Sequence, residues 1–189
     1  MTYAYTPLWF SYAILIFACL LFISVDISRH RSESLNRALL NVLAPLMRDR
    51  EVHGLAGTSY LLIGVLFSVL LFEKHITLLS LLFLAFADPI ASYVGIRYGK
   101  QKIFGQKTIE GTLAAFVVCA IIIFTFAIDR FVYIDHLVVI ALLGGLIGCL
   151  SEAIPVFNLD DNLTFPVLSS VFLWILFWGM NFYSSYPLV

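Results

Sequence analysis

Long apolar runs, each near the ~20 residues that an α-helix needs to cross a bilayer, recur along almost the whole chain. Hydrophobic residues make up 61% of the sequence and charged residues only 12%, which lies outside the usual composition of soluble globular domains. Because backbone polar groups must find partners within the segment in lipid, such runs fold as helices. The pattern predicts an all-α fold, a polytopic transmembrane helical bundle of about six spans.

No long polar stretch interrupts these runs, so residues 1–189 are expected to form a single membrane-embedded domain. A short amphipathic stretch, Leu35–Leu46, is expected to lie along the membrane surface. The expected spans are Leu8–Ile27, Leu55–Phe72, Ile76–Tyr98, Thr112–Ile128, His136–Ile154 and Phe165–Tyr183.

The basic residues sort by loop, which predicts the orientation of the bundle. Only Lys74 and Arg130 fall on the side opposite to the others. By the positive-inside rule, both termini lie on the non-cytoplasmic side, and the loops after spans one, three and five face the cytoplasm. The basic residues assigned to the cytoplasmic side are Arg29, Arg31, Arg37, Arg48, Arg50, Arg97, Lys100, Lys102 and Lys107.

Asp88 lies in the middle of the third expected span. A carboxylate at that depth costs ~2.5–3.5 kcal/mol on insertion scales, so it is expected to face protein, water or a partner charge. Helical spacing places Ser92, Gly95 and Gly99 on the same face. A matching stripe on the fifth span consists of Ala141, Gly145, Gly148 and Glu152. Close packing of the two stripes explains the glycines in part, but the carboxylates need another reason.

The segment KQKIFGQKTIEGT, residues 100–112, joins the third span to the fourth. Gly105 gives this loop conformational freedom, Lys107 supplies a mobile cation, and Thr108 is a candidate cap for the following helix. A helix N-terminus beside lysines is an anion site, above all for phosphate. The alternative is that the lysines only reflect the positive-inside bias and that Thr108 only caps. Spacing alone leaves both interpretations open.

An acidic cluster follows the fifth span, where Glu152 precedes the segment NLDDNLTFP, residues 158–166. Asp160, Asp161 and Asn162 offer adjacent oxygen donors of the kind that Mg²⁺ prefers when it also binds substrate phosphates. The alternative is an acidic turn followed by a helix cap, since Asp and Asn favour both.

The segment RDREVHG, residues 48–54, leads into the second span. Its arginines, Arg48 and Arg50, are candidates for binding phosphate or lipid headgroups. A role as topology anchors at the interface explains them equally well. A cation-bearing helix start, a metal-type acidic cluster and buried carboxylates are thus predicted at one membrane face, and such a set suits phosphoryl or nucleotidyl transfer.

Three ordered motifs resemble the family of CTP-dependent lipid kinases that includes dolichol kinase, phytol kinase and the fungal diacylglycerol kinase. They are DPIASYVGIRYGK at 88–100, GQKTIEGT at 105–112, and a Glu followed by DDNLTFP at 160–166. The resemblance covers about residues 48–166, and RDREVHGLAGTSYLLIG at 48–64 is similar to the bacterial branch of that family. Family members commonly have further membrane helices and a basic-aromatic segment before this region.

The first block is partly shared with phosphatidate cytidylyltransferase, which makes CDP-diacylglycerol. The D-D-N-x-x-x-P ending at 160–166 resembles the kinases. The K-R-x-x-x-x-K-D and P-G-H-G-G-x-x-D-R signature of the cytidylyltransferases is absent from the sequence. Cytidylyl transfer therefore stays as the alternative activity, and an ion-coupled transporter using Asp88 and Glu152 as the alternative from another class.

The resemblance implies a kinase that transfers the terminal phosphate of CTP to the hydroxyl of a membrane lipid alcohol: polyprenol, a phytol-like alcohol or diacylglycerol. Mg²⁺ or another divalent cation is the implied cofactor, and no nucleic-acid partner is expected. The active site is expected on the cytoplasmic face, in the plasma membrane if the source is bacterial. Which carboxylate acts as the base stays open.

Three overlapping sets of site residues are predicted. The catalytic residues are Asp88, Lys107, Glu110 and Asp161. The nucleotide or phosphate ligands are Ser92, Gly95, Gly99, Lys100, Lys107, Thr108, Gly111, Arg48 and Arg50. The metal ligands are Asp88, Glu152, Asp160, Asp161 and Asn162.

Overall fold

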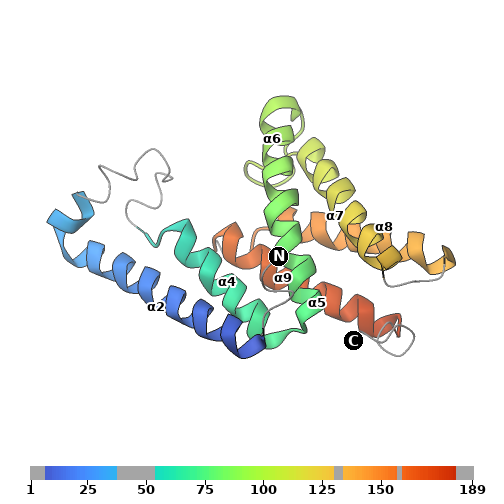
Figure 1. The fold of residues 1–189 in the computed structure, drawn as a ribbon. Helices are drawn as coiled ribbons and strands as arrows, with labels where there is room; N and C mark the ends of the chain where they lie inside the picture. Colours follow the sequence, from blue (N-terminus) through green and yellow to red (C-terminus); the bar gives the residue numbers. More distant parts are fainter. Residues whose placement is uncertain (1–6, 38–53, 130–133, 157–158, 182–189) are drawn as a thin grey trace.

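The computed structural model describes residues 7–37, 54–129, 134–156 and 159–181, and over these ranges the chain is helical and contains no strand (Figure 1). Five helices are long and apolar enough to cross a membrane, the segment Lys74–Tyr98 counting as one. The remaining helix, α4, has 15 residues. The predicted all-α membrane bundle is confirmed. The elements are α2 Leu8–Arg31, α4 Gly57–Leu71, α5 Lys74–Leu82, the π-helix η3 Phe83–Ala87, α6 Asp88–Tyr98, α7 Ile109–Asp129, α8 Ile134–Ala153 and α9 Asp161–Gly179.

Most helix ends differ from the predicted spans by one to four residues, and two of them extend into polar sequence. Helix α2 continues past Ile27 to Arg31, and α9 begins at Asp161 rather than at Phe165. In α9, the carboxylate of Asp160 accepts a hydrogen bond from the backbone N–H of Asn162 at 3.0 Å, which is an N-cap contact. Hydropathy missed both ends because each helix extends into a polar turn. The predicted surface helix Leu35–Leu46 lies outside the described residues from position 38 onward.

The core forms where α5, η3, α7 and α9 meet. Phe83, Phe165 and Phe177 are among its largest fully buried side chains. By contrast, α2 contacts α4 at one side of the molecule (Figure 1) and exposes Trp9 and Phe17. A helix with so little protein contact and so much apolar surface suits a position facing lipid.

Helix α7 lies between α6 and α8, and the small-residue stripes of both neighbours pack on it. A Cβ atom added to Gly145 of α8 would lie 2.9 Å from the carbonyl oxygen of Phe116 of α7. One added to Gly95 of α6 would lie 2.9 Å from Oγ1 of Thr108, just before α7. The prediction that the two stripes pack on each other is therefore wrong: each stripe packs on the segment that contains α7.

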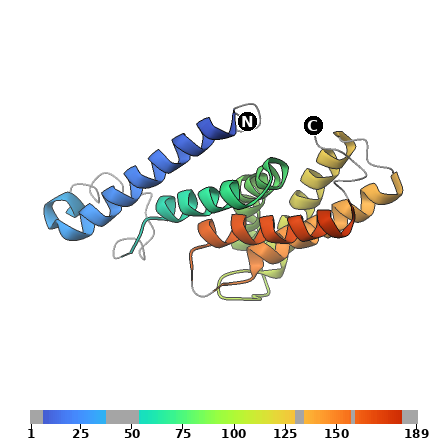
Figure 2. The same cartoon turned by 90° about the horizontal axis from the view of Figure 1, so that it is seen from below.

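Helices α4 and α9 run side by side (Figure 2). The two helices are in close contact at Gly64, where an added Cβ would lie 2.9 Å from the carbonyl oxygen of Asn162. The Nδ2 amide of Asn162 also donates to the carbonyl oxygen of Gly57 at 3.4 Å. Helix α4 thus supports the N-terminus of α9, which carries Asp161.

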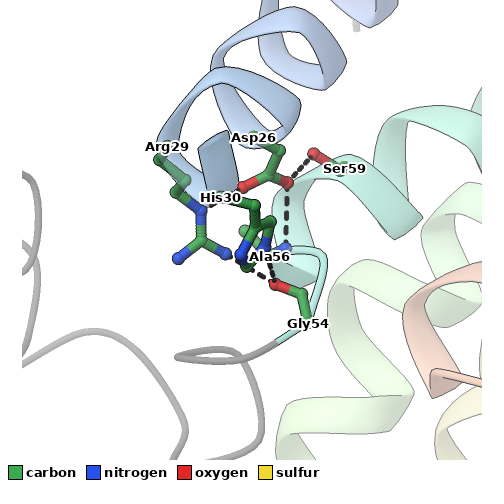
Figure 3. A network of polar contacts seen from close by, with 6 residues as sticks. All are labelled: Asp26, Arg29, His30, Gly54, Ala56 and Ser59. Atoms are coloured by element: carbon green, nitrogen blue, oxygen red, sulfur yellow. Dashed lines mark hydrogen bonds and ion pairs between the residues drawn. The ribbon is translucent and has the colours of Figure 1, made fainter. Parts of the chain in front are cut away.

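A buried polar cluster joins α2 to the start of α4 (Figure 3). Asp26 is 4% exposed and accepts from Nε of Arg29 at 2.6 Å and from the backbone N–H of Ala56 at 2.9 Å. The Ser59 hydroxyl donates to the same carboxylate, and Nη2 of Arg29 donates to the carbonyl oxygen of Gly54 at 2.7 Å. Arg29, predicted only as a topology anchor, is a buried partner of Asp26.

Candidate active site

A tight turn between α6 and α7 presents Lys107. The backbone N–H of Lys107 donates to the carbonyl oxygen of Phe104 at 2.8 Å, and that of Ile103 donates to the carbonyl oxygen of Lys107 at 2.9 Å. Gly105, inside the turn, has a φ of +53°, a left-handed conformation that costs other residues energy. The glycine required by this turn sets the position of the lysine.

The start of α7 is pressed against α6. Thr108 is 7% exposed, and its Oγ1 accepts a hydrogen bond from the backbone N–H of Gly111 at 3.2 Å, which confirms the predicted cap. A Cβ added to Gly111 would lie 2.7 Å from the carbonyl oxygen of Ala91. The glycine therefore permits a close approach of the two helices beneath Lys107.

The ammonium of Lys107 lies among three carboxylates from three elements. Its Nζ atom is 2.5 Å from Oε1 of Glu152 at the end of α8, 3.2 Å from Oδ2 of Asp161 at the start of α9 and 3.9 Å from Oδ1 of Asp88 at the start of α6. Burial lowers the pKa of Lys107, but the hydrogen bond and charge of Glu152 and the charges of the two Asp side chains outweigh it, so this pKa lies above its usual value.

A π-helix precedes Asp88 and sets its position along the third span. Residues Phe83–Ala87 form η3, and Pro89 follows Asp88 within the first turn of α6. Proline lacks a backbone N–H and so disturbs the regular hydrogen-bond ladder, and π-helical turns are frequent at functional sites. The change of register is what allows a carboxylate in the middle of a span to lie near Lys107.

A cavity of about 590 Å³ opens beside this cluster, within the ~300–1,000 Å³ range of small-molecule sites. Glu152 is largely buried at its wall, with a side chain 2% exposed, whereas the Asp161 side chain is 43% exposed. Asp88 does not line the cavity but reaches Lys107 from beside it. The predicted site residues that line it are Ser92, Gly95, Gly99, Lys100, Lys107, Thr108, Gly111, Glu152 and Asp161.

Known proteins match the chain over most of its length. It is 36% identical to CTP-dependent diacylglycerol kinase 1 of Eremothecium gossypii over 169 aligned residues, which cover 79% of this chain and 53% of that relative. It is 32% identical to the protein of the same name in Saccharomyces cerevisiae over 178 residues, covering 84% and 61%. The match to the Schizosaccharomyces pombe protein of that name is 32% identical over 162 residues and covers 80% of this chain and 74% of the relative. The chain belongs to the family of CTP-dependent lipid kinases.

Other members of this lipid kinase family also match. Dolichol kinase of Saccharomyces cerevisiae is 31% identical over 160 residues, which cover 29% of its length. The chain spans 61% and 53% of the length of the first two diacylglycerol kinases, so it corresponds to part of each. No family model and no solved structure matches it.

Some predicted site residues of this lipid kinase family member make contacts within the fold. Asp160 caps α9, and Asn162 donates toward α4. The Glu110 carboxylate interacts with the backbone amides of Lys100 and Gln101, so it supports the loop. None of Asp160, Asn162 and Glu110 lines the cavity, and their catalytic or metal roles stay predictions. Arg48 and Arg50 lie outside the described residues.

The carboxylate oxygens around Lys107 are of the kind that bind divalent cations such as Mg²⁺. Oε2 of Glu152 is buried and has no hydrogen-bond partner within the described part of the chain. The three carboxylates outnumber the single ammonium, so negative charge is in excess. Within residues 7–37, 54–129, 134–156 and 159–181, however, no three His, Cys, Asp or Glu side chains are already arranged around one ion position. The ammonium of Lys107 lies among the three carboxylates.

Sequence reasoning missed three polar residues that line the cavity and one buried carboxylate in the separate cluster between α2 and α4. Lys102, Gln106 and Thr112 also line the cavity. Asp26, which lies inside an apolar run, was not singled out, although an ionisable residue in a span is the same signal that identified Asp88. For Lys102, Gln106 and Thr112 no comparable signal exists, since polar residues are ordinary in loops and helix starts.

Proposed function

We propose that this family member transfers the terminal phosphate of CTP to the hydroxyl of a membrane lipid alcohol, such as a polyprenol, a phytol-like alcohol or diacylglycerol. The observation that carries the proposal is Lys107, which meets Glu152, Asp161 and Asp88 at the edge of a 590 Å³ cavity. The names of the relatives, which are CTP-dependent diacylglycerol kinases, support CTP as the donor.

Lys107 is proposed to bind the phosphates of the nucleotide. Its raised pKa keeps the ammonium charged, and its 24% exposed side chain reaches the cavity. Lys100 also lines the cavity and adds positive charge, while Gly95 and Gly99 let Thr108 at the start of α7 pack closely on α6. Arg48 and Arg50 are proposed to add further phosphate contacts.

Glu152 and at least one of Asp161 and Asp88 are proposed to hold a divalent cation such as Mg²⁺ once Lys107 turns toward the phosphates. The bound ion would neutralise charge on the transferred phosphoryl group. The buried Oε2 atom of Glu152 supports this assignment, because an unsatisfied carboxylate oxygen is costly in the interior. Asp160 and Asn162 are proposed to support the site by shaping the start of α9.

Asp88 or Asp161, whichever of the two does not hold the cation, is proposed to receive the proton of the lipid hydroxyl. The Asp161 side chain is 43% exposed and lines the cavity, whereas the Asp88 side chain is 23% exposed and lies beside it. In the reaction, the hydroxyl oxygen forms a bond to the terminal phosphorus, the bond from that phosphorus to the bridging oxygen breaks, and CDP leaves with the bonding electrons. The products are the lipid phosphate and CDP.

The site is proposed to face the cytoplasm, where CTP is available. The bias of basic residues toward the loops after spans one and three supports this orientation. In a bacterium the membrane would be the plasma membrane.

The direct test is phosphate transfer by purified protein in lipid. Protein, Mg²⁺ and CTP labelled at the γ-phosphate are incubated with polyprenol, phytol and diacylglycerol, first pooled and then singly. Label in the organic phase is expected for wild type and not for Lys107→Ala. If γ-label stays in water while α-labelled CTP and phosphatidate give CDP-lipid, the protein is a cytidylyltransferase. Ion-dependent uptake by vesicles without nucleotide turnover would instead indicate a transporter.

A further inference from the structure

A second cavity of about 310 Å³ lies beside the first, between the turn and the faces of α7 and α8. Its walls are apolar apart from the hydroxyl of Thr112 and the thiol of Cys149. It opens at the surface of the bundle, where Ile109 is 46% and Leu113 61% exposed. The residues that line this apolar groove are Ile103, Ile109, Thr112, Leu113, Phe116 and Cys149.

The apolar groove begins where the polar cavity ends. Thr112 belongs to the walls of both. On α8, Cys149 lines the groove and Glu152, three residues later and on the same helix face, lines the polar cavity. The Thr112 Oγ1 atom is buried and has no hydrogen-bond partner in the described part of the chain. A donor or acceptor of a ligand at this junction would satisfy it.

The turn between α6 and α7 contributes polar side chains to one cavity and apolar side chains to the other. Lys102 and Gln106 lie on the wall of the polar cavity, whereas Ile103 and Ile109 lie on the wall of the groove. The polar cavity and the apolar groove meet at Thr112. Together they could bind an amphiphilic molecule whose polar head is joined directly to a hydrocarbon chain. Because α7 is a membrane-spanning helix, a molecule that reaches Leu113 and Phe116 arrives from the hydrocarbon of the bilayer.

We infer that the apolar groove binds the first part of the hydrocarbon tail of the acceptor lipid and that Thr112 contacts the polar group at the head of that tail. The inference rests on the proposed kinase function and locates its lipid substrate. The groove lies at the small end of the ~300–1,000 Å³ range of ligand pockets, which fits a segment of one chain rather than a whole lipid. The rest of the tail lies in the bilayer.

Photocrosslinking tests this location without turnover. Wild-type protein in phospholipid vesicles is irradiated with diacylglycerol, and separately with polyprenol, that carries a diazirine near the head of its chain. Crosslinks are expected in peptides that contain residues 103–116 and residue 149, and unlabelled lipid should compete them away. Crosslinks of both probes spread over the exposed apolar faces, α2 included, without enrichment at the groove would overturn the inference.

A kinetic comparison separates the groove from the nucleotide site. Leu113→Trp is expected to raise the KM for lipid about tenfold and to leave the KM for CTP unchanged. Thr112→Val, at the junction of the two cavities, is expected to raise the KM for lipid about tenfold as well. Val117→Trp is the matched control, because Val117 is 49% exposed one turn further along α7 and does not line the groove. If both groove variants behave like the control and the crosslinks show no enrichment, the groove is not the lipid site although the kinase stands.

The two tests also distinguish failure of the groove from failure of the kinase proposal. If wild-type protein transfers no phosphate from CTP, the proposed function is wrong. The crosslinking result alone then shows whether the groove binds a lipid tail. If Leu113→Trp does not fold, Thr112→Val and the wild-type crosslinks test whether the groove binds the lipid tail.

Discussion

The Nζ atom of Lys107 lies 2.5 Å from Oε1 of Glu152, although the two residues are 45 positions apart in the chain. The carboxylate is buried and comes from the end of α8, whereas the lysine comes from the turn before α7. The buried carboxylate holds the lysine at the wall of the cavity until the phosphates of the nucleotide bind. Lys107 and Glu152 are therefore expected to act as a coupled unit.

A double-mutant cycle on Lys107 and Glu152 tests this unit. Lys107→Ala is expected to lower kcat/KM for CTP about 100-fold or more, because it removes a charge that contacts the phosphates. Glu152→Gln is expected to cause a large loss as well, and the loss in the double variant to be smaller than the product of the two single losses. Arg37→Ala is the control, since Arg37 is 78% exposed and pairs on the surface with Glu33. Losses that multiply in the double variant would mean that the two residues act independently.

The raised pKa of Lys107 predicts slow chemical modification at alkaline pH. A group whose folded-state pKa is raised contributes stability that is complete below the unfolded value and is lost as pH rises through the folded value. Lys107 should thus stay charged at pH values where an unperturbed lysine side chain begins to lose its proton. Timed acylation read by mass spectrometry is expected to label Lys107 slowly in wild type and faster in Glu152→Gln. An equal labelling rate of Lys107 in the two proteins would contradict the prediction.

Asp161 and Asp160 are adjacent but are expected to respond differently to the divalent cation. Asp161→Asn should raise the Mg²⁺ concentration for half-maximal activity about tenfold, because an amide is a weaker ligand than a carboxylate. Asp160→Asn should shift it much less, since Asn caps a helix as well as Asp does. Mg²⁺ titration of both variants checks this. An equal shift for both would make Asp160 a ligand.

The buried polar cluster around Asp26 is predicted to stabilise the folded protein. Asp26→Ala removes the carboxylate partner of Arg29, which is 3% exposed, and breaking such a buried pair costs about 3–5 kcal/mol. Thermal unfolding in detergent should show a clear decrease in Tm. Glu33→Ala is the matched control, because the Glu33 side chain is 91% exposed in its ion pair, and exposed pairs contribute about 0–1 kcal/mol. Equal Tm values for the two variants would show that the buried pair adds little.

Close packing of α6 on α7 is predicted to depend on Gly111. In Gly111→Ala the new Cβ would lie 2.7 Å from the carbonyl oxygen of Ala91, and relief of such a contact typically costs about 1–3 kcal/mol. The shift should also displace Thr108 and reduce activity. Gly179→Ala is the control, because nothing lies within 4 Å of its added Cβ, and its effect should stay within about 0.5 kcal/mol. Unfolding curves and the phosphate-transfer assay measure both effects, and wild-type behaviour of Gly111→Ala would contradict the packing argument.

Local features of the site were predictable because they depend on neighbours in sequence. Thr108 caps α7 through a contact three residues away, and Gly105 takes a positive φ within a four-residue turn. The same local reasoning left two alternatives for Asp160 and Asn162, because it allowed either metal ligands or a capped helix start. Only the packing of α9 on α4 shows that Asn162 donates toward Gly57.

By itself, the sequence determined the membrane helices, the polar turn before α7 and the set of ionisable residues that needed partners. These follow from hydropathy and from hydrogen bonds over a few residues, which act along the chain. The tertiary structure decided which carboxylates meet Lys107, that both glycine stripes pack on the segment containing α7, and that Asp26 joins α2 to α4. Those pairings join residues tens of positions apart, and they depend on how whole helices pack, which no local pattern encodes.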